Sequence, residues 1–289
     1  IANRMDAVRV AEEYAMIDVI SRGRLEMGFV KGAPFEVSPA NSNPATLMER
    51  FWEAHDLIIK ALTTHDGPFN WEGEHFQYRQ VNVWPRPYQD PHPPIWMTVM
   101  SPGSAAEAGS RGYSIASLNT GYLRTPDIYN GYRKAATDAG KEATVDRFGY
   151  LAIVGVGETD EEGRRRADQI LDYSRTTPRA ASQFWFPPGY TSNEVTAQML
   201  RNRGPNMIPL RDGGEFAMQY GTVDEFINAG VAFAGNPDAV FEQIKEFHDH
   251  VGGIGHLLMM GQGGHISHEE TVGNLSLFSK EVLPRLKEL

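Results

Sequence analysis

Residues 8–32 read VRVAEEYAMIDVISRGRLEMGFVKG and predict a helix, a tight turn and a buried strand that ends in lysine and glycine. Apolar side chains recur at the spacing of one helix face, at Val8, Ala11, Ala15 and Val19. Asp6 is placed to cap this helix, and residues 21–23 end it. The strand at residues 25–30 is apolar enough to be buried on both faces, as a parallel sheet requires. Lys31 falls at its carboxyl end, where α/β folds bind their ligands.

The composition narrows the class of protein. A chain of 289 residues with 41% hydrophobic content predicts one large domain with a substantial core. No run approaches the ~18 to 20 apolar residues of a membrane span, and no signal peptide opens the chain, so we expect a cytoplasmic protein with no membrane partner. The absence of cysteine excludes disulfides, thiolate metal sites and a cysteine nucleophile. The formal charge of −10 argues against nucleic acid as a partner.

Strands and helices alternate along the chain. The sequence predicts five short strands, at residues 25–30, 95–100, 113–118, 148–156 and 256–260. It predicts helices between them, at residues 44–62, 105–110, 126–139, 159–173, 236–251 and 269–289. This alternation predicts a parallel sheet, either open and doubly wound or closed as an eight-stranded barrel. A closed barrel needs three more strands upstream of Ile1, so we expect the chain to be a fragment.

Residues 175–229 break the alternation. A stretch this long is typical of a functional loop or lid, and it is aromatic around residues 184–190. Residues 236–237, by contrast, predict a helix start with an asparagine cap and a proline in the first helical position.

Ser101 and Ser104 lie between the end of a predicted strand and the start of a helix, where free N–H groups and the helix dipole favour a phosphate. The alternative, which the spacing alone favours, is that Ser104 only caps the helix. For Lys31 there are likewise two interpretations: it supplies the positive counter-charge for that phosphate, or it is a solvated lysine on the surface. His248 and His250 are two residues apart on a helix and face different directions, so we predict no metal site.

Further motifs in order carry a family resemblance. They are residues 93–112 (PPIWMTVMSPGSAAEAGSRG), 113–119 (YSIASLN), 150–171 (YLAIVGVGETDEEGRRRADQIL), 234–261 (AGNPDAVFEQIKEFHDHVGGIGHLLMMG) and 275–289 (LSLFSKEVLPRLKEL). Together with residues 8–32, this set resembles the bacterial luciferase-like flavin monooxygenases, the LLM class of flavin-dependent oxidoreductases. The resemblance covers nearly the whole chain and implies an α/β fold, a TIM (β/α)8 barrel lacking about its first three strands. It implies one barrel domain over residues 1–289, with a lid or insertion at about residues 175–229.

The resemblance also implies a cofactor and its site. Reduced FMN binds at the carboxyl ends of the strands, reacts with O2 to give a C4a-hydroperoxide and oxygenates a substrate while the pocket excludes water. Matching positions place Lys31, Ser101 and Ser104 at the phosphate, Val30 and Met100 near the flavin, and Ser117 and Leu118 at the ring. Bacterial luciferase has arginine, cysteine and glutamate where this chain has Lys31, Val30 and Met100, so light emission is not expected. The family's catalytic histidine lies upstream of Ile1, so no catalytic residue is assigned.

The first functional hypothesis is a two-component FMN-dependent monooxygenase acting on a small apolar substrate such as a terpene or alkane. Its partners are then a flavin reductase that supplies reduced FMN, the substrate, O2 and a second copy in a homodimer. One alternative is an oxidoreductase that uses the deazaflavin F420, since similar barrels bind it in the same place. Another is a flavin-binding protein without turnover.

Overall fold

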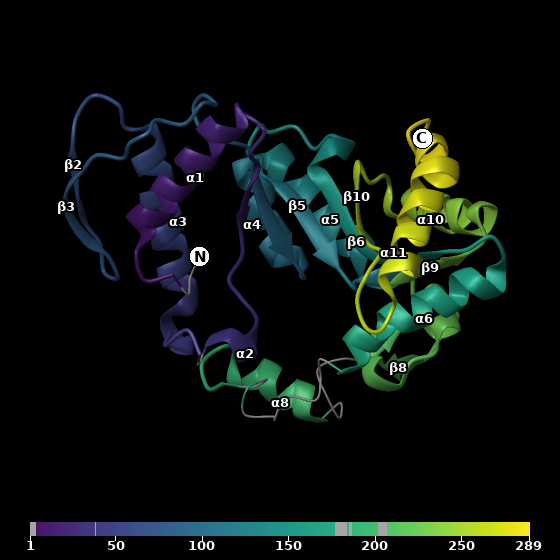
Figure 1. The fold of residues 1–289 in the computed structure, drawn as a ribbon. Helices are drawn as coiled ribbons and strands as arrows, with labels where there is room; N and C mark the ends of the chain where they lie inside the picture. The colour runs from purple at the N-terminus through teal and green to yellow at the C-terminus, as the bar shows by residue number, and fades with distance from the viewer. Residues whose placement is uncertain (1–3, 38, 177–183, 185–186, 202–206) are drawn as a thin grey trace. The chain divides into compact units, whose positions relative to one another are not determined.

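The computed structural model describes the chain except residues 1–3, 38, 177–183, 185–186 and 202–206 (Figure 1). The chain divides into two compact units, each continuous in space but not in sequence. The first unit comprises Ile1–Met97 and Ala180–Arg201, and the second comprises Thr98–Arg179 and Asn202–Leu289. Each unit is described by itself.

The first unit is built on two long helices and a pair of parallel strands. Its helices are α1 (Ala7–Ser21), α2 (Pro34–Val37), η1 (Pro44–Thr46), α3 (Leu47–Thr63) and α8 (Asn193–Arg201). Its strands are β1 (Met27–Phe29), β2 (Phe69–Glu72), β3 (Gln77–Val81) and the first three residues of β4 (Ile95–Val99). Helices α1 and α3 pack against each other, and β2 and β3 form an antiparallel hairpin beside α3 (Figure 1).

Helix α1 begins as predicted, because the Asp6 carboxylate accepts a hydrogen bond of 3.0 Å from the backbone N–H of Arg9. Its buried face differs from the predicted one: Val8 is only half-buried and Val19 is exposed. The residues that pack inside are Ala7, Val10, Ala11, Ala15 and Asp18. The contact face is therefore mostly alanine, which lets another element approach the helix backbone closely.

Asp18 is an aspartate with no exposed surface, and Gln89 provides its hydrogen-bond donors. The backbone N–H and the side-chain amide of Gln89 each donate a hydrogen bond of 2.8 Å to the Asp18 carboxylate. The helix then ends at Arg22, which adopts a left-handed conformation with a φ of 56°. The predicted turn is thus confirmed, and a buried side chain with hydrogen-bond partners stabilises it.

Strand β1 is shorter than predicted and is buried on one face only. Met27 and Phe29 have no exposed surface, whereas Gly28 and Val30 on the opposite face are exposed. A Cβ atom at Gly28 would meet nothing within 4 Å. The expectation of two buried faces is wrong for this strand, since its side chains alternate between a packed and an open side. Met27, Gly28 and Phe29 pair in parallel with the first three residues of β4.

The second unit contains a parallel sheet with buried strands. The parallel strands of this unit are β5 (Ser114–Leu118), β6 (Phe148–Val156), β9 (Ala232–Gly235) and β10 (His256–Met260). A separate antiparallel pair consists of β7 (Met207–Pro209) and β8 (Glu215–Ala217). Strand β6 is the longest, and it pairs in parallel with β5, β9 and β10. Nearly every residue of β5, β6 and β9 is buried, as the apolar sequence of parallel strands predicts.

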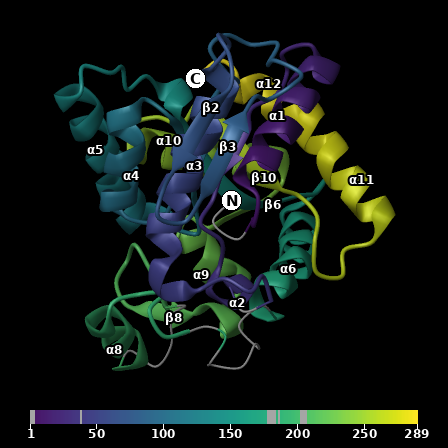
Figure 2. The ribbon, with the colours of Figure 1, turned by 90° about the vertical axis from the view of Figure 1, so that its left-hand side faces the viewer.

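Helices surround these strands. They are α4 (Pro102–Arg111), α5 (Gly121–Asp138), η2 (Val145–Arg147), α6 (Asp160–Thr176), η4 (Met218–Tyr220), α9 (Val223–Asn228), α10 (Pro237–Val251), α11 (His268–Leu277), η5 (Phe278–Val282) and α12 (Leu283–Leu286). Helices α4 and α5 run side by side in both views (Figures 1 and 2). A Cβ atom at Gly109 would lie 2.6 Å from the Tyr132 carbonyl oxygen, and one at Gly131 would lie 2.8 Å from that of Pro102. Glycine on both helices therefore permits this close packing.

Helix α5 begins at Gly121, five residues before its predicted start, and Pro126 lies inside it. Proline has no N–H to donate to the carbonyl group four residues earlier, which belongs to Tyr122. A ring nitrogen of His250 on α10 lies 2.9 Å from that carbonyl oxygen and takes the place of the missing donor. The helix therefore continues through a residue that usually starts or breaks one.

The segment at residues 175–229 is more regular than predicted. Its described residues contain helices α8 and α9 and the antiparallel pair β7 and β8. Residues 177–183, 185–186 and 202–206 of the predicted lid lie outside the described residues. Strand β9 was also missed, and it adds a sixth parallel strand to the five predicted from the sequence.

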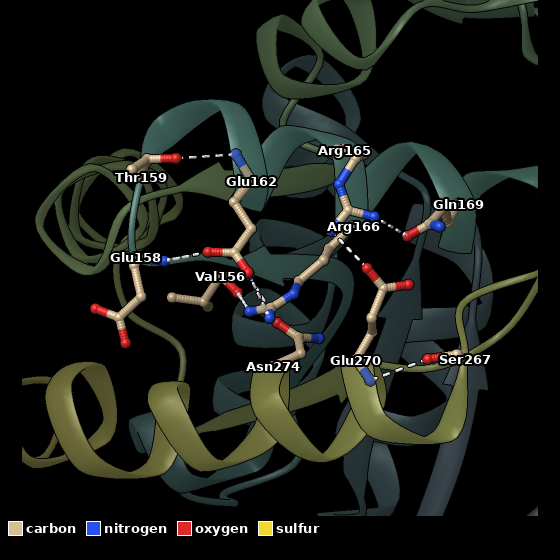
Figure 3. A network of polar contacts seen from close by, with 10 residues as sticks. All are labelled: Val156, Glu158, Thr159, Glu162, Arg165, Arg166, Gln169, Ser267, Glu270 and Asn274. Atoms are coloured by element: carbon tan, nitrogen blue, oxygen red, sulfur yellow. Dashed lines mark hydrogen bonds and ion pairs between the residues drawn. The ribbon is translucent and has the colours of Figure 1, made fainter.

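A polar network attaches α6 and α11 to the end of β6 (Figure 3). The Arg166 guanidinium donates to the Val156 carbonyl oxygen at 2.6 Å and pairs with Glu162 at 2.7 Å. The Asn274 side-chain oxygen accepts from the Val156 N–H at 2.7 Å, and its amide nitrogen donates to the Val154 carbonyl oxygen at 2.9 Å. Strand β10 pairs with β6 only as far as Ile153, so the Asn274 amide takes over where the neighbouring strand stops.

Candidate flavin site

The predicted site residues follow the carboxyl ends of three strands. Val30 and Lys31 follow β1 in the first unit, and Met100 and Ser101 follow β4. Leu118 is the last residue of β5. The carboxyl ends of parallel strands are the usual ligand-binding edge of α/β proteins.

Ser101, not Ser104, caps helix α4. The Ser101 hydroxyl oxygen accepts from the Ser104 N–H at 3.3 Å, and the Ser104 hydroxyl oxygen accepts from the Ser101 N–H at 3.2 Å. Pro102 occupies the first helical position, so the helix begins three residues earlier than predicted. The reciprocal bonds form a capping box, which fixes both hydroxyl groups at the start of the helix.

This helix start has the chemistry to hold a phosphate group. The first N–H groups of a helix have no partner within the helix, and the helix dipole adds partial positive charge there. Ser101 and Gly103 are exposed, and Ser104 is half-buried. A Cβ atom at Gly103 would meet nothing within 4 Å, so a ligand has open access to the backbone. The residues present therefore fit the phosphate of FMN.

The remaining predicted residues of the second unit divide into two kinds. Met100 exposes 52% of its surface, and Leu118 is half-buried, so both are accessible to a ligand. Ser117 has no exposed surface, and its hydroxyl lies 3.4 Å from that of Tyr129 on α5. Its side chain therefore packs between β5 and α5 and is not accessible to a flavin ring. Only the backbone atoms of Ser117 could make the predicted contact.

Lys31, in the first unit, is a half-buried cation. Burial lowers the pKa of its ammonium group, and no nearby charge opposes that effect. Among the residues that the structure describes, no carboxylate forms an ion pair with it. Its Nζ atom lies instead 3.8 Å from the centre of the Tyr190 ring. The expectation of a solvated lysine is wrong in this respect, because an aromatic side chain covers the ammonium group.

Tyr190 is the residue of this site that sequence reasoning missed. Its hydroxyl donates a hydrogen bond of 2.6 Å to the Gly32 carbonyl oxygen, so Tyr190 contacts both Lys31 and Gly32. Burial, with the charge of Glu36, raises the pKa of Tyr190 to about 12, which keeps the hydroxyl protonated as a donor. The only signal in the sequence was the pair of prolines and the glycine that precede an aromatic residue at positions 187–190.

The histidines considered as ligands have local structural partners. His248 accepts a hydrogen bond from the Ile254 N–H at 3.3 Å, and His250 contacts the Tyr122 carbonyl oxygen. In the described part of the chain, no three His, Asp or Glu side chains are grouped to hold a metal ion. The same part contains no helix with the length and apolar character of a membrane span.

An α/β fold with anion-binding chemistry after its parallel strands defines a class of cofactor-binding enzymes, and the comparisons identify the family. The family model described as luciferase-like monooxygenase matches residues 1–252. The chain therefore belongs to the luciferase-like monooxygenase family, as the motifs predicted.

Two curated relatives have similar sequences. One is the oxygenase component of the flavin-dependent trigonelline monooxygenase of Acinetobacter baylyi, which is 30% identical over 260 residues. That match covers 83% of this chain and 71% of the relative. The other is the uncharacterized protein y4wF of Sinorhizobium fredii, 31% identical over 157 residues, with 53% of this chain and 45% of that protein covered. This chain thus spans less than half of y4wF.

Solved structures share the fold. The monooxygenase RslO1 of Streptomyces bottropensis has a TM-score of 0.73 at 22% identity, covering 97% of this chain and 74% of that one. The oxygenating constituent of 3,6-diketocamphane monooxygenase from Pseudomonas putida, in complex with FMN, has a TM-score of 0.71 at 21% identity, covering 96% and 75%. An F420-dependent secondary alcohol dehydrogenase has a TM-score of 0.68 at 17% identity, covering 96% and 74%. These neighbours confirm the predicted fold class, a luciferase-like α/β barrel type.

Proposed function

We propose that this protein is the oxygenase of a two-component monooxygenase, which uses reduced FMN and O2 to oxygenate a small apolar organic molecule. The observation that carries the proposal is the open, serine-capped start of α4 directly after a parallel strand, in a member of the luciferase-like monooxygenase family. Bound reduced FMN supplies two electrons, so that one atom of O2 enters the substrate and the other leaves as water.

The chain's own residues bind and orient the cofactor in this proposal. Ser101, Ser104 and the first N–H groups of α4 hold the phosphate. Met100 follows β4 and Leu118 ends β5, and their accessible side chains provide apolar contact for the ring system. In the first unit, Val30 is 45% exposed and provides a further apolar contact, and Lys31 provides a cation for an anionic group of the ligand.

The proposed partners follow from the same chemistry. A cofactor that must arrive reduced requires a flavin reductase, and the relatives named for trigonelline and for diketocamphane support a small organic substrate. We propose a terpene or alkane as that substrate, a homodimer as the assembly and the cytoplasm as the location.

One of the structural neighbours is an F420-dependent secondary alcohol dehydrogenase, which supports F420 as an alternative cofactor. A dehydrogenase of that kind transfers hydride and consumes no O2, and a flavin-binding protein without turnover consumes neither O2 nor substrate. The three functions therefore differ in what they do with a reduced cofactor.

The test mixes the purified protein anaerobically with reduced FMN or reduced F420 and then adds O2 and a panel of terpenes and alkanes. We expect substrate-dependent O2 consumption with FMN and an oxygenated product that contains one atom from 18O2. Oxidation of F420 by a carbonyl substrate without O2 uptake contradicts the proposal in favour of the dehydrogenase. Tight FMN binding without product formation favours the non-catalytic protein.

A further inference from the structure

Lys31 is an unusual cation because it is half-buried and yet has no ion-pair partner among the described residues. Buried ammonium groups are normally paired with a carboxylate, because removing a charge from water is costly. Burial alone accounts for the lowered pKa of Lys31, which agrees with the absence of a neutralising neighbour. A half-buried titratable group with a shifted pKa is typical of functional sites.

Tyr190 gives this cation a different kind of support. The face of an aromatic ring attracts an ammonium group through its quadrupole, and the distance of 3.8 Å from Nζ to the ring centre is close. The ring carries no net charge, so Lys31 keeps its full attraction for an anion. A carboxylate at the same place would hold the lysine and also compete with the ligand.

The turn that carries Tyr190 packs against other residues of the first unit. Pro187 is buried, and the Tyr190 N–H donates to the Pro187 carbonyl oxygen at 3.1 Å. Gly189 adopts a φ of +87°, and a Cβ atom there would lie 2.9 Å from the Cα atom of Ala45. The ring is thus held from two sides, by this packing and by the hydrogen bond from its hydroxyl to Gly32.

Glu36 is the charged group that faces the tyrosine. Its carboxylate accepts a hydrogen bond of 2.5 Å from the Ala33 N–H, so the backbone of its own turn holds it. Its charge acts on the Tyr190 hydroxyl, and no ion pair between Glu36 and Lys31 is found among the described residues. The carboxylate therefore supports the donor role of Tyr190 without neutralising the lysine.

We propose that Tyr190 is a positioning residue that holds the Lys31 ammonium, without neutralising it, for an anionic group of the ligand. This inference rests on the proposed function, since it takes FMN as the ligand. It adds to that function a residue that lies 158 positions along the chain from Gly32, the residue to which its hydroxyl donates.

The experiment compares FMN with riboflavin, which lacks the phosphate, by fluorescence titration of the whole chain. The variants are Tyr190→Leu, which removes the ring, and Tyr190→Phe, which keeps the ring and removes only the hydroxyl. Phe69→Leu is the matched control, because the Phe69 ring lies 5.0 Å from the ammonium group of another lysine, Lys60, on the β2–β3 hairpin side of α3. The NMR signal of the Lys31 Hε protons, assigned by its loss in Lys31→Met, reports the ring contact directly.

We expect Tyr190→Leu to weaken FMN binding by about fivefold, the size of one partly exposed cation–π contact, and to leave riboflavin binding unchanged. Tyr190→Phe restores most of the affinity, and Phe69→Leu matches the parent. The Lys31 Hε signal moves to high field in the parent and in Tyr190→Phe, and returns to its ordinary position in Tyr190→Leu.

Two results overturn the inference and leave the proposed function standing: equal FMN affinity in Tyr190→Leu and the parent, or equal weakening of FMN and riboflavin, which indicates packing alone. A parent protein that binds neither flavin overturns the proposed function and this inference with it. The NMR shift shows in that case whether the contact itself exists.

Discussion

The serine pair at the start of α4 has two roles at the scale of single residues, and they are separable. Both hydroxyl groups cap the helix. In addition, the Ser101 hydroxyl can donate to a phosphate, and the Ser104 hydroxyl can do so by giving up its hydrogen bond of 2.9 Å to the Ser101 carbonyl oxygen. Replacing Ser101 and Ser104 by alanine should lower the free energy of unfolding by about 1 kcal/mol through the lost cap. It should also weaken FMN binding by about tenfold or more, since hydrogen bonds to a charged group are stronger than neutral ones.

Ser267→Ala is the matched control for this prediction. Ser267 caps α11 in the same way, with its hydroxyl oxygen accepting from the Glu270 N–H at 3.2 Å. We expect this variant to lose similar stability in thermal melting and to bind FMN like the parent. If the double serine variant keeps its FMN affinity, the serines are caps only and the phosphate lies elsewhere.

The sequence could propose the serines and Lys31 as site residues because local patterns carry that information: a strand, a turn and a helix start are consecutive in the chain. It assigned the cap to the wrong serine, since both Ser101 and Ser104 have suitable spacing to a later residue. Tyr190 could not be placed, because its contact with Lys31 depends on how two distant segments pack.

At the scale of elements, Glu53 joins helix α3 to the β2–β3 hairpin. Its carboxylate accepts hydrogen bonds from the Trp71 indole N–H at 3.0 Å and from the His75 and Phe76 N–H groups at 2.9 Å each. Burial acts to raise the pKa of Glu53, but these hydrogen bonds outweigh it and lower the pKa below its ordinary value of 4.5.

A lowered pKa in the folded state means that Glu53 stabilises the fold above its unfolded pKa and ceases to do so as the pH falls through the folded one. Glu53→Gln should therefore reduce stability at pH 7, and the difference from the parent should shrink below about pH 4.5. Chemical denaturation at several pH values measures this. The exposed Glu74 of the same hairpin is the control, and Glu74→Gln should show no such difference. A deficit for Glu53→Gln that is independent of pH contradicts the charge-based explanation.

Asn274 is the corresponding connection in the second unit. It is fully buried, and its amide contacts backbone groups of Val154, Val156 and Gly261. Asn274→Leu leaves these groups without a partner and should cost about 3 kcal/mol or more, since each unsatisfied buried group costs roughly 1 to 3 kcal/mol.

Ser276→Ala, at an exposed position of the same helix, is the control and should change the unfolding free energy by less than about 0.5 kcal/mol. Equal stability of Asn274→Leu and the parent in urea denaturation would show that water replaces the lost partners.

The sequence predicted elements well where the periodic pattern is long. The strands at residues 148–156 and 256–260 have the predicted bounds, and Asn236 caps α10 with Pro237 in its first position. Strand β9 escaped because its four residues, AFAG, are too few to show a period. The start of α5 was misplaced because Pro126 normally marks a helix start, and the compensating histidine lies on another helix.

At the scale of the whole molecule, the order of strands and helices predicted the α/β class, because a right-handed parallel crossover is the ordinary solution for such an alternation. The division of the chain into two compact units does not follow from the sequence. It depends on which distant segments pack together, and residues 180–201 join a unit whose other residues end at Met97.

The formal charge of −10 acts on any anion that approaches the molecule. We expect the association rate of FMN to rise with ionic strength between about 10 and 150 mM, because salt screens this repulsion. The rate for uncharged riboflavin should stay constant, and stopped-flow fluorescence measures both. A rate for FMN that falls with salt would show that the positive charge near Lys31 and α4 dominates even at long range.

The hydrogen bond to Asn274 makes one backbone N–H proton of β6 a reporter of the docking of helix α11. The Val156 N–H donates to a side chain on α11, so its exchange with deuterium depends on whether that helix is docked. The N–H groups of β6 that pair with another strand do not share this dependence. A single exchange-protected proton at the end of β6 can therefore follow the transient undocking of α11 in the intact protein, without a label.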